Sequence, residues 1–200
     1  LFFAWGAGTG ERGERYESER MSSKAKGASP GGGDRINSEL FTLTYGALVR
    51  HLLLDLESPE EVNKQLDKMG QNIGIRLVDD FLAKTNTGRC RNFREAAKTI
   101  AETGFRMFLG CSAKVTQIDD KECKMVLSEN PLTDFVELPE KLQPLSYCSL
   151  LCGVIRGALE QISMKVECEI SKDPLKGDER FELHMRLVEY VNEEYPFKDD

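Results

Sequence analysis

The segment from Leu145 to Ser163 constrains the fold more than any other part of the chain. Its apolar residues follow a helical spacing and cover nearly the whole circumference: Leu150, Leu151, Val154, Ile155, Ala158, Leu159 and Ile162. A helix that is apolar all round is buried on more than one side. We therefore expect other elements to cover this helix, with Gly153 and Gly157 permitting tight helix packing.

Three helices are predicted ahead of this segment. They cover residues 38–56, 58–85 and 92–108, and each begins at a residue that commonly caps a helix: Ser38, Ser58 and Asn92. Glu61 and Glu95 stand at capping-box positions. Gly70 and Gly74 lie four residues apart on the stripe of the second helix. Because a mid-helix glycine costs about 1 kcal/mol relative to alanine, this pair suggests close approach by another backbone.

Strand-like runs complete the folded part. They lie at residues 112–118, 123–128, 164–170 and 181–187, and the last two alternate between apolar and polar side chains. The order of elements is α-α-α-β-β-α-β-β. This order is typical of an α+β fold, in which helices pack on one face of a small antiparallel sheet.

Composition divides the chain and excludes several function classes. Residues 11–35 are charged and small, and residues 1–35 hold 8 of the 17 glycines, so we expect a disordered extension at residues 1–35. The folded domain is expected at residues 36–190 and a C-terminal tail at 191–200.

A net charge of −7 without a basic stripe argues against nucleic-acid binding. No apolar run reaches the length of a transmembrane helix, about 18 residues.

The cysteines and histidines argue against a metal or cofactor site. The chain has two histidines and six cysteines, and no four of them have the spacing of zinc ligands. We therefore expect no metal and no bound cofactor. The cysteines also lack the close spacing of a disulfide framework, which indicates a reducing compartment.

Cys90 is the cysteine best placed for reactivity. It lies between Arg89 and Arg91 in a loop that precedes a helix, and nearby cations and a helix N-terminus favour the thiolate. The helices on either side have apolar faces with small residues that leave room for a slot: Gly70, Gly74 and Gly104. A nucleophilic thiol at the mouth of an apolar slot suits S-acylation. The alternative interpretation is an exposed loop cysteine without a role.

Five collinear segments carry a resemblance to a known family. They are ELFTLTYGAL at residues 39–48, DKMG…GIRL at 67–77, GRC at 88–90, NPLTDFVELP at 130–139 and LCGVIRGALE at 151–160. Together they span most of residues 37–186. They resemble the third subunit, and its 3-like paralogue, of the trafficking protein particle complex, TRAPP.

The resemblance implies a fold and a cellular role. It implies helices against a twisted four-stranded antiparallel sheet, and a non-catalytic scaffold subunit that pairs with other TRAPP small subunits. The assembled complex tethers vesicles between the endoplasmic reticulum and the Golgi, and exchanges nucleotide on an early-secretory Rab GTPase. We therefore expect a cytoplasmic protein at the cis-Golgi and the endoplasmic reticulum, with peripheral membrane association only.

The resemblance also implies a modification site. In this family the cysteine of the Gly-Arg-Cys motif can be palmitoylated, and the acyl chain lies in a buried channel. Cys90 holds that position, and Gly104 falls where the family keeps a small channel-lining residue, so covalently bound palmitate is expected. The family's C-terminal end reaches toward the GTPase, which makes Glu193 and Glu194 candidates for that contact.

Two other functions remain open from the residues alone. One is a stand-alone acyl-binding or self-acylating module that does not join the complex. The other is a thiol enzyme such as an acyl hydrolase, which needs a base beside Cys90. The candidate bases are His51 and His184, and a structural role is the simpler interpretation of each.

Overall fold

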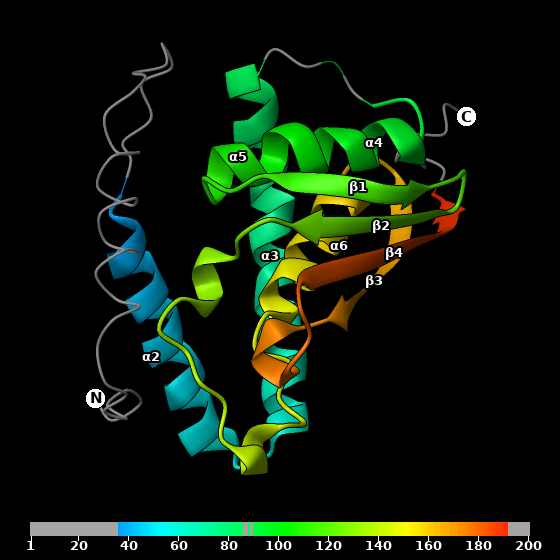
Figure 1. Cartoon of the computed structure of the whole chain (residues 1–200). Coiled ribbons are helices and arrows are strands. Elements are labelled where there is room, and N and C mark those ends of the chain that lie inside the picture. The colour runs from blue at the N-terminus through cyan, green and yellow to red at the C-terminus, as the bar shows by residue number, and fades with distance from the viewer. Residues whose placement is uncertain (1–35, 86–87, 89, 192–200) are drawn as a thin grey trace, which may run out of the picture. The chain divides into compact units, whose positions relative to one another are not determined.

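The computed structural model describes residues 36–85, 88 and 90–191 (Figure 1). By compactness the chain divides into Leu1–Ile36 and Asn37–Asp200, and the helices and strands of the described residues belong to the second unit. The extension predicted at residues 1–35 and nearly all of the tail predicted at 191–200 lie outside the described residues. Both therefore stay predictions.

Helices and a four-stranded sheet make up this unit, in the predicted order. The longer elements are α2 (Ser38–Leu56), α3 (Pro59–Thr85), α4 (Phe93–Thr99), α5 (Phe105–Phe108), β1 (Ala113–Ile118), β2 (Glu122–Leu127), α6 (Ser149–Glu160), β3 (Met164–Lys172) and β4 (Phe181–Tyr190). Every strand pairing is antiparallel, and the strand order is β1-β2-β4-β3. The predicted α+β fold is confirmed.

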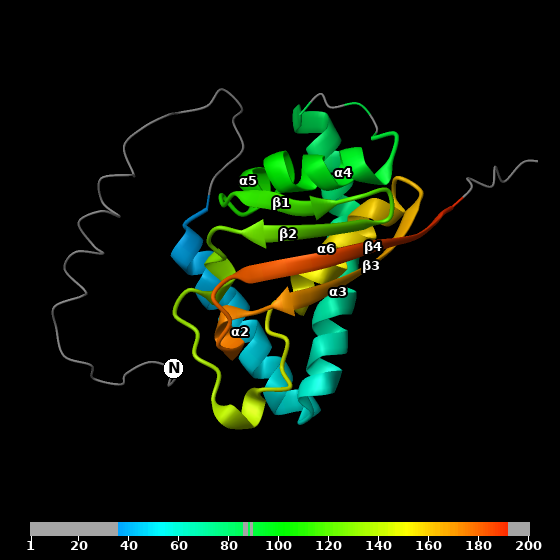
Figure 2. The same cartoon turned by 45° about the vertical axis from the view of Figure 1, so that its right-hand side comes forward.

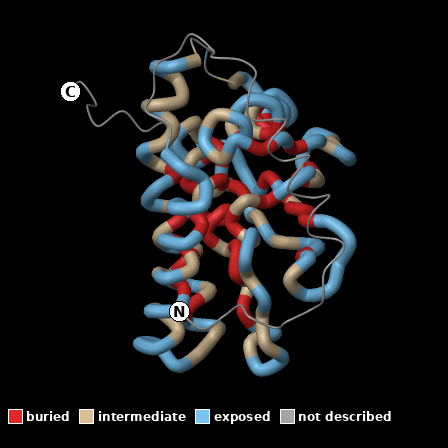
Figure 3. Tube along the Cα trace, turned by 60° about the vertical axis from the view of Figure 1, so that its left-hand side comes forward, coloured by how far each residue is buried: buried red, intermediate tan, exposed pale blue. Residues whose placement is uncertain are grey.

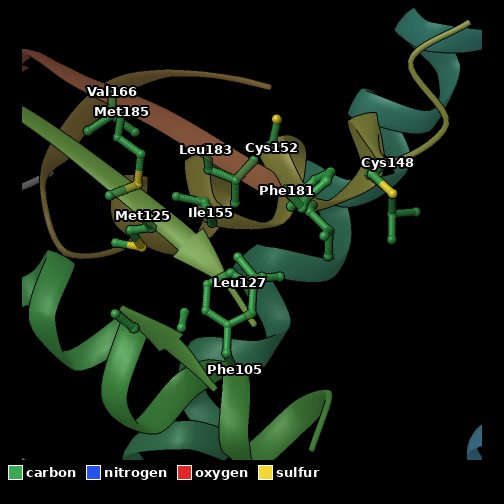
Figure 4. Close-up of a cluster of buried hydrophobic side chains, with 14 of the residues drawn as sticks. Phe105, Met125, Leu127, Cys148, Cys152, Ile155, Val166, Phe181, Leu183 and Met185 are labelled. Atoms are coloured by element: carbon green, nitrogen blue, oxygen red, sulfur yellow. The ribbon is translucent and has the colours of Figure 1, made fainter. Parts of the chain in front are cut away.

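Helix α6 lies between the sheet and α3 (Figures 1 and 2). Buried positions gather in the interior of the unit (Figure 3). There, α6 contributes Cys152 and Ile155 to a cluster with Leu183 of β4, Met125 of β2 and Phe105 of α5 (Figure 4). Burying one such large apolar side chain contributes roughly 1.5–3 kcal/mol. The apolar circumference of α6 thus has a partner on each side, as its sequence predicts.

Helices α3 and α6 approach so closely that only glycine fits at four positions of their contact: Gly70, Gly74, Gly153 and Gly157. A Cβ atom placed on Gly74 would lie 2.1 Å from the carbonyl oxygen of Val154. A Cβ atom placed on Gly153 would lie 2.0 Å from the carbonyl oxygen of Asp67. The close backbone approach predicted from the glycines is therefore confirmed.

Two predicted helix starts differ in detail from the structure. Asn37, not Ser38, caps α2, because its side chain accepts the N–H groups of the first turn. The capping box predicted for α3 does not form. The Ser58 hydroxyl donates instead to the carboxylate of Glu60 at 2.8 Å, and Glu61 pairs with a lysine one turn further on.

The third predicted helix is not continuous. Residues Ile100–Gly104 form a π-helical turn between α4 and α5, closed by a hydrogen bond from the N–H of Phe105 to the carbonyl of Ile100. Glycine at position 104 weakens a regular helix there, and single π turns often occur at functional sites. The apolar spacing alone gave no sign of this insertion.

The turn between β3 and β4 buries a carboxylate. Asp173 is 3 % exposed, and its Oδ1 accepts the N–H of Leu175 at 3.0 Å. Its Oδ2 is buried and has no hydrogen-bond partner among the described residues. Burial raises the pKa of Asp173, and the nearby charge of Asp178 adds to this effect. The ionised carboxylate is therefore a local cost to stability.

Substitution of Gly74 tests the helix contact. We expect Gly74→Ala to lower the free energy of unfolding by about 2 kcal/mol or more, because the new methyl group overlaps backbone. Gly104→Ala is the matched control, since its Cβ would meet no atom closer than 3.9 Å. It should be neutral or stabilising by up to about 1 kcal/mol. Equal denaturant midpoints for the two variants would contradict this account of the contact.

Substitution of Asp173 tests the buried carboxylate. Because the pKa is raised in the folded state, folding favours the protonated form, and the charge costs stability above the folded pKa. Asp173→Asn keeps the acceptor for Leu175 and removes the charge. We expect a higher melting temperature than wild type near neutral pH, with a difference that shrinks as the pH falls through the folded pKa. Asp120→Asn, on an exposed side chain, should show no such trend.

Candidate functional site: an apolar cavity beside Cys90

A cavity of about 570 Å³ lies among α2, α3, the α4–α5 segment and α6. Its wall is almost entirely apolar and includes Met69, Leu77, Phe81, Ile100, Phe108 and Val154. The volume falls within the range of small-molecule sites, about 300–1,000 Å³. Such a wall offers dispersion contacts to an apolar ligand and almost no hydrogen bonds, so a hydrocarbon chain is the chemistry that fits it.

Cys90 lines this cavity and is half-buried. Its Sγ lies 3.7 Å from Oγ1 of Thr99 at the end of α4, with the thiol as donor. The thiol is thus placed at the wall of the apolar space and not in an exposed loop. This geometry supports the slot interpretation of Cys90 over the alternative of a surface cysteine without a role.

Backbone and side-chain hydrogen bonds hold the segment that follows Cys90. Asn92 caps α4 as predicted, accepting the N–H of Glu95 at 2.8 Å, and the Glu95 carboxylate accepts the N–H of Arg91 at 2.8 Å. From the other side, the hydroxyl of Tyr190 at the end of β4 accepts the N–H of Phe93 at 3.2 Å. The thiol is therefore carried by a segment anchored to both the helix and the sheet.

The structure separates the three glycines that were predicted to line the slot. Gly104 lines the cavity, and a Cβ atom added there would meet only the carbonyl oxygen of Thr99, at an ordinary contact distance of 3.9 Å. Gly70 and Gly74 do not line it, because the backbone of α6 covers both. The prediction of a lining role is wrong for these two, since the side of α3 that holds them is the side in contact with α6.

The remaining predicted site residues are accounted for as follows. Arg89, Glu193 and Glu194 lie outside the described residues. His51 is exposed on α2 and faces Asp55 at 3.5 Å. His184 is half-buried on the sheet, where it lies between the carboxylates of Glu169 and Glu122. Neither histidine lines the cavity beside Cys90. The base that a thiol enzyme requires is therefore not found among the described residues around Cys90.

Three of the other cysteines show how burial lowers the reactivity of a thiol. Burial raises the pKa of Cys111 to about 11 and that of Cys123 to about 12. Cys148 is fully buried, and its pKa is raised as well. A thiol with a raised pKa remains protonated near neutral pH and is a poor nucleophile.

Two further features concern ligands and membranes. Within the described residues, no cluster of three or more histidine, cysteine or acidic side chains is arranged to hold a metal ion. Across the same residues, no helix combines the length and apolar character needed to cross a bilayer.

Thr99 is the site residue that sequence reasoning missed. Thr99 was missed because it is polar, whereas the helical pattern used for prediction takes only the apolar positions into account. The spacing along the chain gave no signal either, because α4 carries Thr99 about 10 Å away from its first residue, and the preceding loop has to run back along the helix for Cys90 to reach it.

Known proteins with similar sequences cover nearly the whole folded part. The sequence model of the family described as "Transport protein particle (TRAPP) component" matches residues 41–186. Trafficking protein particle complex subunit 3 of Dictyostelium discoideum is 50 % identical over 166 residues, 82 % of this chain and 89 % of that protein. Transport protein particle subunit bet3 of Schizosaccharomyces pombe is 48 % identical over 170 residues, 84 % and 92 % of the two chains.

A solved structure agrees with the fold. It is a crystal structure of a trafficking protein particle complex subunit 3 from Naegleria fowleri covalently bound to palmitic acid. Its TM-score is 0.76 at 48 % identity, and the match covers 80 % of this chain and 100 % of that chain. The family match runs from α2 into β4 and includes Cys90 and the cavity walls. The chain belongs to the TRAPP component family.

Proposed function

We propose that this protein is a non-catalytic scaffold subunit of a TRAPP complex and that palmitate is attached to Cys90 as a thioester. The acyl chain lies in the apolar cavity. The observation that carries this proposal is the half-buried thiol at the wall of a cavity whose lining is almost wholly apolar. The palmitic acid covalently bound in the Naegleria fowleri subunit 3 supports the same ligand.

A preformed apolar cavity beside the thiol favours an acyl chain inside the protein over one in the membrane. Burial contributes about 0.8 kcal/mol per methylene in either place, on the order of 10 kcal/mol for a palmitoyl chain, so a chain in the cavity adds this gain to the stability of the fold. A single acyl chain inserted in a bilayer gives only marginal, reversible anchoring. The chain therefore serves mainly to stabilise the fold, and the protein associates with membranes only peripherally.

Membership of the family supports the role in assembly. Besides the subunit 3 proteins, trafficking protein particle complex subunit 5 of Dictyostelium discoideum is 26 % identical over 70 % of this chain. Related small domains thus occur among different subunits of the complex. We infer that this chain pairs with other TRAPP small subunits through surfaces outside the acyl cavity.

The proposed complex acts in traffic from the endoplasmic reticulum to the Golgi. Through that complex the protein takes part in vesicle tethering and in nucleotide exchange on an early-secretory Rab GTPase, without an active site or a cofactor of its own. Contact of Glu193 and Glu194 with the GTPase is part of this proposal. The cytoplasmic faces of the cis-Golgi and the endoplasmic reticulum are the proposed location.

A stand-alone acyl-binding module is the second candidate. One observation favours it: the described cavity is formed within this one chain. Such a module needs no partner subunit to enclose its ligand. The two candidates share the chemistry of Cys90 and differ in whether the protein is found in an assembly.

Affinity purification separates the two candidates. A tagged form of the full chain, isolated from cells, should retain other TRAPP subunits at near-equal amounts in quantitative mass spectrometry. Cys90→Ser serves as a second bait, and it should retain the same subunits because the modification is internal. A folded, acylated bait without other TRAPP subunits would refute the scaffold role and leave the acyl-binding module.

Two variants test the position of the acyl chain. Cys90→Ser should abolish the hydroxylamine-sensitive palmitoyl mass, and it should lower the melting temperature of the purified protein by about 5 °C or more. Gly104→Leu keeps the thiol but fills the cavity, so it should also prevent palmitoylation. Gly104→Ala is the matched control and should be acylated normally.

Membrane fractionation completes this test. We expect Cys90→Ser to change membrane association less than it changes thermal stability, because the chain is enclosed by protein. An unchanged melting temperature together with lost membrane binding would show that the chain anchors the protein in the bilayer.

A further inference from the structure

Three hydroxyl groups line the cavity, and they differ in their hydrogen bonds. The hydroxyls of Thr44 and Tyr45 donate to backbone carbonyl groups, at 2.7 and 2.5 Å. The Thr99 hydroxyl oxygen instead accepts a hydrogen bond from the Cys90 thiol, with Sγ and Oγ1 3.7 Å apart. Its own proton has no acceptor in the described part of the chain. Thr99 therefore holds an unused donor beside the nucleophile.

We propose that Thr99 is a catalytic residue for the acylation of Cys90. Its hydroxyl first accepts the S–H group and so aims the thiol, and it then donates a hydrogen bond to the carbonyl oxygen of the incoming acyl group. The inference rests on the proposed S-acylation of Cys90. A threonine hydroxyl is both donor and acceptor and rotates to suit, so one side chain serves both steps.

The reaction needs only an acyl thioester as co-substrate. The Sγ–C bond to Cys90 forms, the C–S bond of a long-chain acyl-coenzyme A breaks, and the thiol proton passes to the leaving coenzyme A thiolate. Between these steps the former carbonyl oxygen carries negative charge. That oxygen is two covalent bonds from Sγ, which places it within reach of a hydroxyl that already touches Sγ.

The apolar surroundings strengthen the hydrogen bond that the Thr99 hydroxyl donates to the oxyanion. A hydrogen bond to a developing oxyanion is stronger in a region of low dielectric than in water. Elsewhere, removing one such donor slows acyl transfer by about 10²–10³. The wall around Cys90 supplies few other polar side chains, since most of it consists of aliphatic and aromatic residues.

The position of Thr99 is fixed by the secondary structure. Thr99 is the last residue of α4, and its backbone remains helical where the π turn begins. The Cys90 side of the pair is held by the cap at Asn92 and by Tyr190. Donor and nucleophile are thus both held by α4, one at its last residue and the other through the cap at its start, as a preorganised site requires.

The test compares Thr99→Val, which has the same shape without the hydroxyl, with Thr99→Ser, which keeps it. Unacylated full-length protein is mixed with palmitoyl-coenzyme A, and the hydroxylamine-sensitive adduct on Cys90 is followed by intact mass. Thr99→Val should acylate about tenfold or more slowly than wild type, whereas Thr99→Ser should stay within about threefold. Thr116→Val, on an exposed part of β1, is the matched control and should acylate like wild type.

Alkylation of the same thiol distinguishes catalysis from packing. Iodoacetamide reacts with Cys90 without forming an oxyanion, so Thr99→Val, which loses only the aiming of the thiol in this reaction, should slow alkylation by no more than about threefold, far less than it slows acylation. An equal loss of acylation and alkylation in Thr99→Val would overturn the proposal, because Thr99 would then only shape access to the thiol. Unchanged acylation in that variant would overturn it as well.

The same experiment separates this inference from the proposed function. A wild-type protein that is alkylated but never acylated at Cys90 would refute both. A wild-type protein that is acylated together with an equally active Thr99→Val would refute only the role of Thr99. Melting temperatures of all variants verify that each rate belongs to folded protein.

Discussion

The backbone contact between α3 and α6 is the constraint on which the rest of the structure depends. Four glycines let the two helices touch, and the Arg156–Asp67 ion pair spans the same contact. With α3 against one side of α6 and the sheet against the other, α6 has little freedom to move. The residues that flank the glycines then become walls: Met69 and Ile73 of α3, with Val154 and Ala158 of α6, line the cavity. The helix contact and the cavity are therefore two consequences of one arrangement.

The cavity links the stability of the fold to the proposed acyl ligand. Side chains that border an apolar space have fewer partner atoms than those of a filled core, so an acyl chain in that space supplies the missing contacts. Under the proposed function, palmitate is best understood as a removable part of the core. The lipid then stabilises the folded subunit and contributes little to holding it on a membrane.

Much of the fold follows from residue patterns, and the departures have physical causes. The all-round apolar α6, the alternating strands and the glycine pairs predicted the central helix, the sheet and the close helix contact. Gly70 and Gly74 were wrongly assigned to the cavity. In a sequence, a glycine at a helix contact and a glycine at a cavity wall both appear as a glycine on the apolar face of a helix. The π turn escaped notice because its extra residue falls in a segment whose apolar spacing still fits a regular helix. Thr99 was missed because periodicity records apolar positions only.

The sequence by itself determined which faces are apolar, the order of the elements, and that Cys90 sits in a loop next to such faces. Only the tertiary structure decided which apolar positions fill the core and which border a cavity, since both classes have the same composition. It also decided that the thiol meets a hydroxyl nine residues away and that Tyr190, a hundred residues further on, anchors its segment. The reason is that helical periodicity shows on which side of a helix a residue lies, whereas a cavity depends on the distance between helix axes. In this protein four glycines set the distance between α3 and α6.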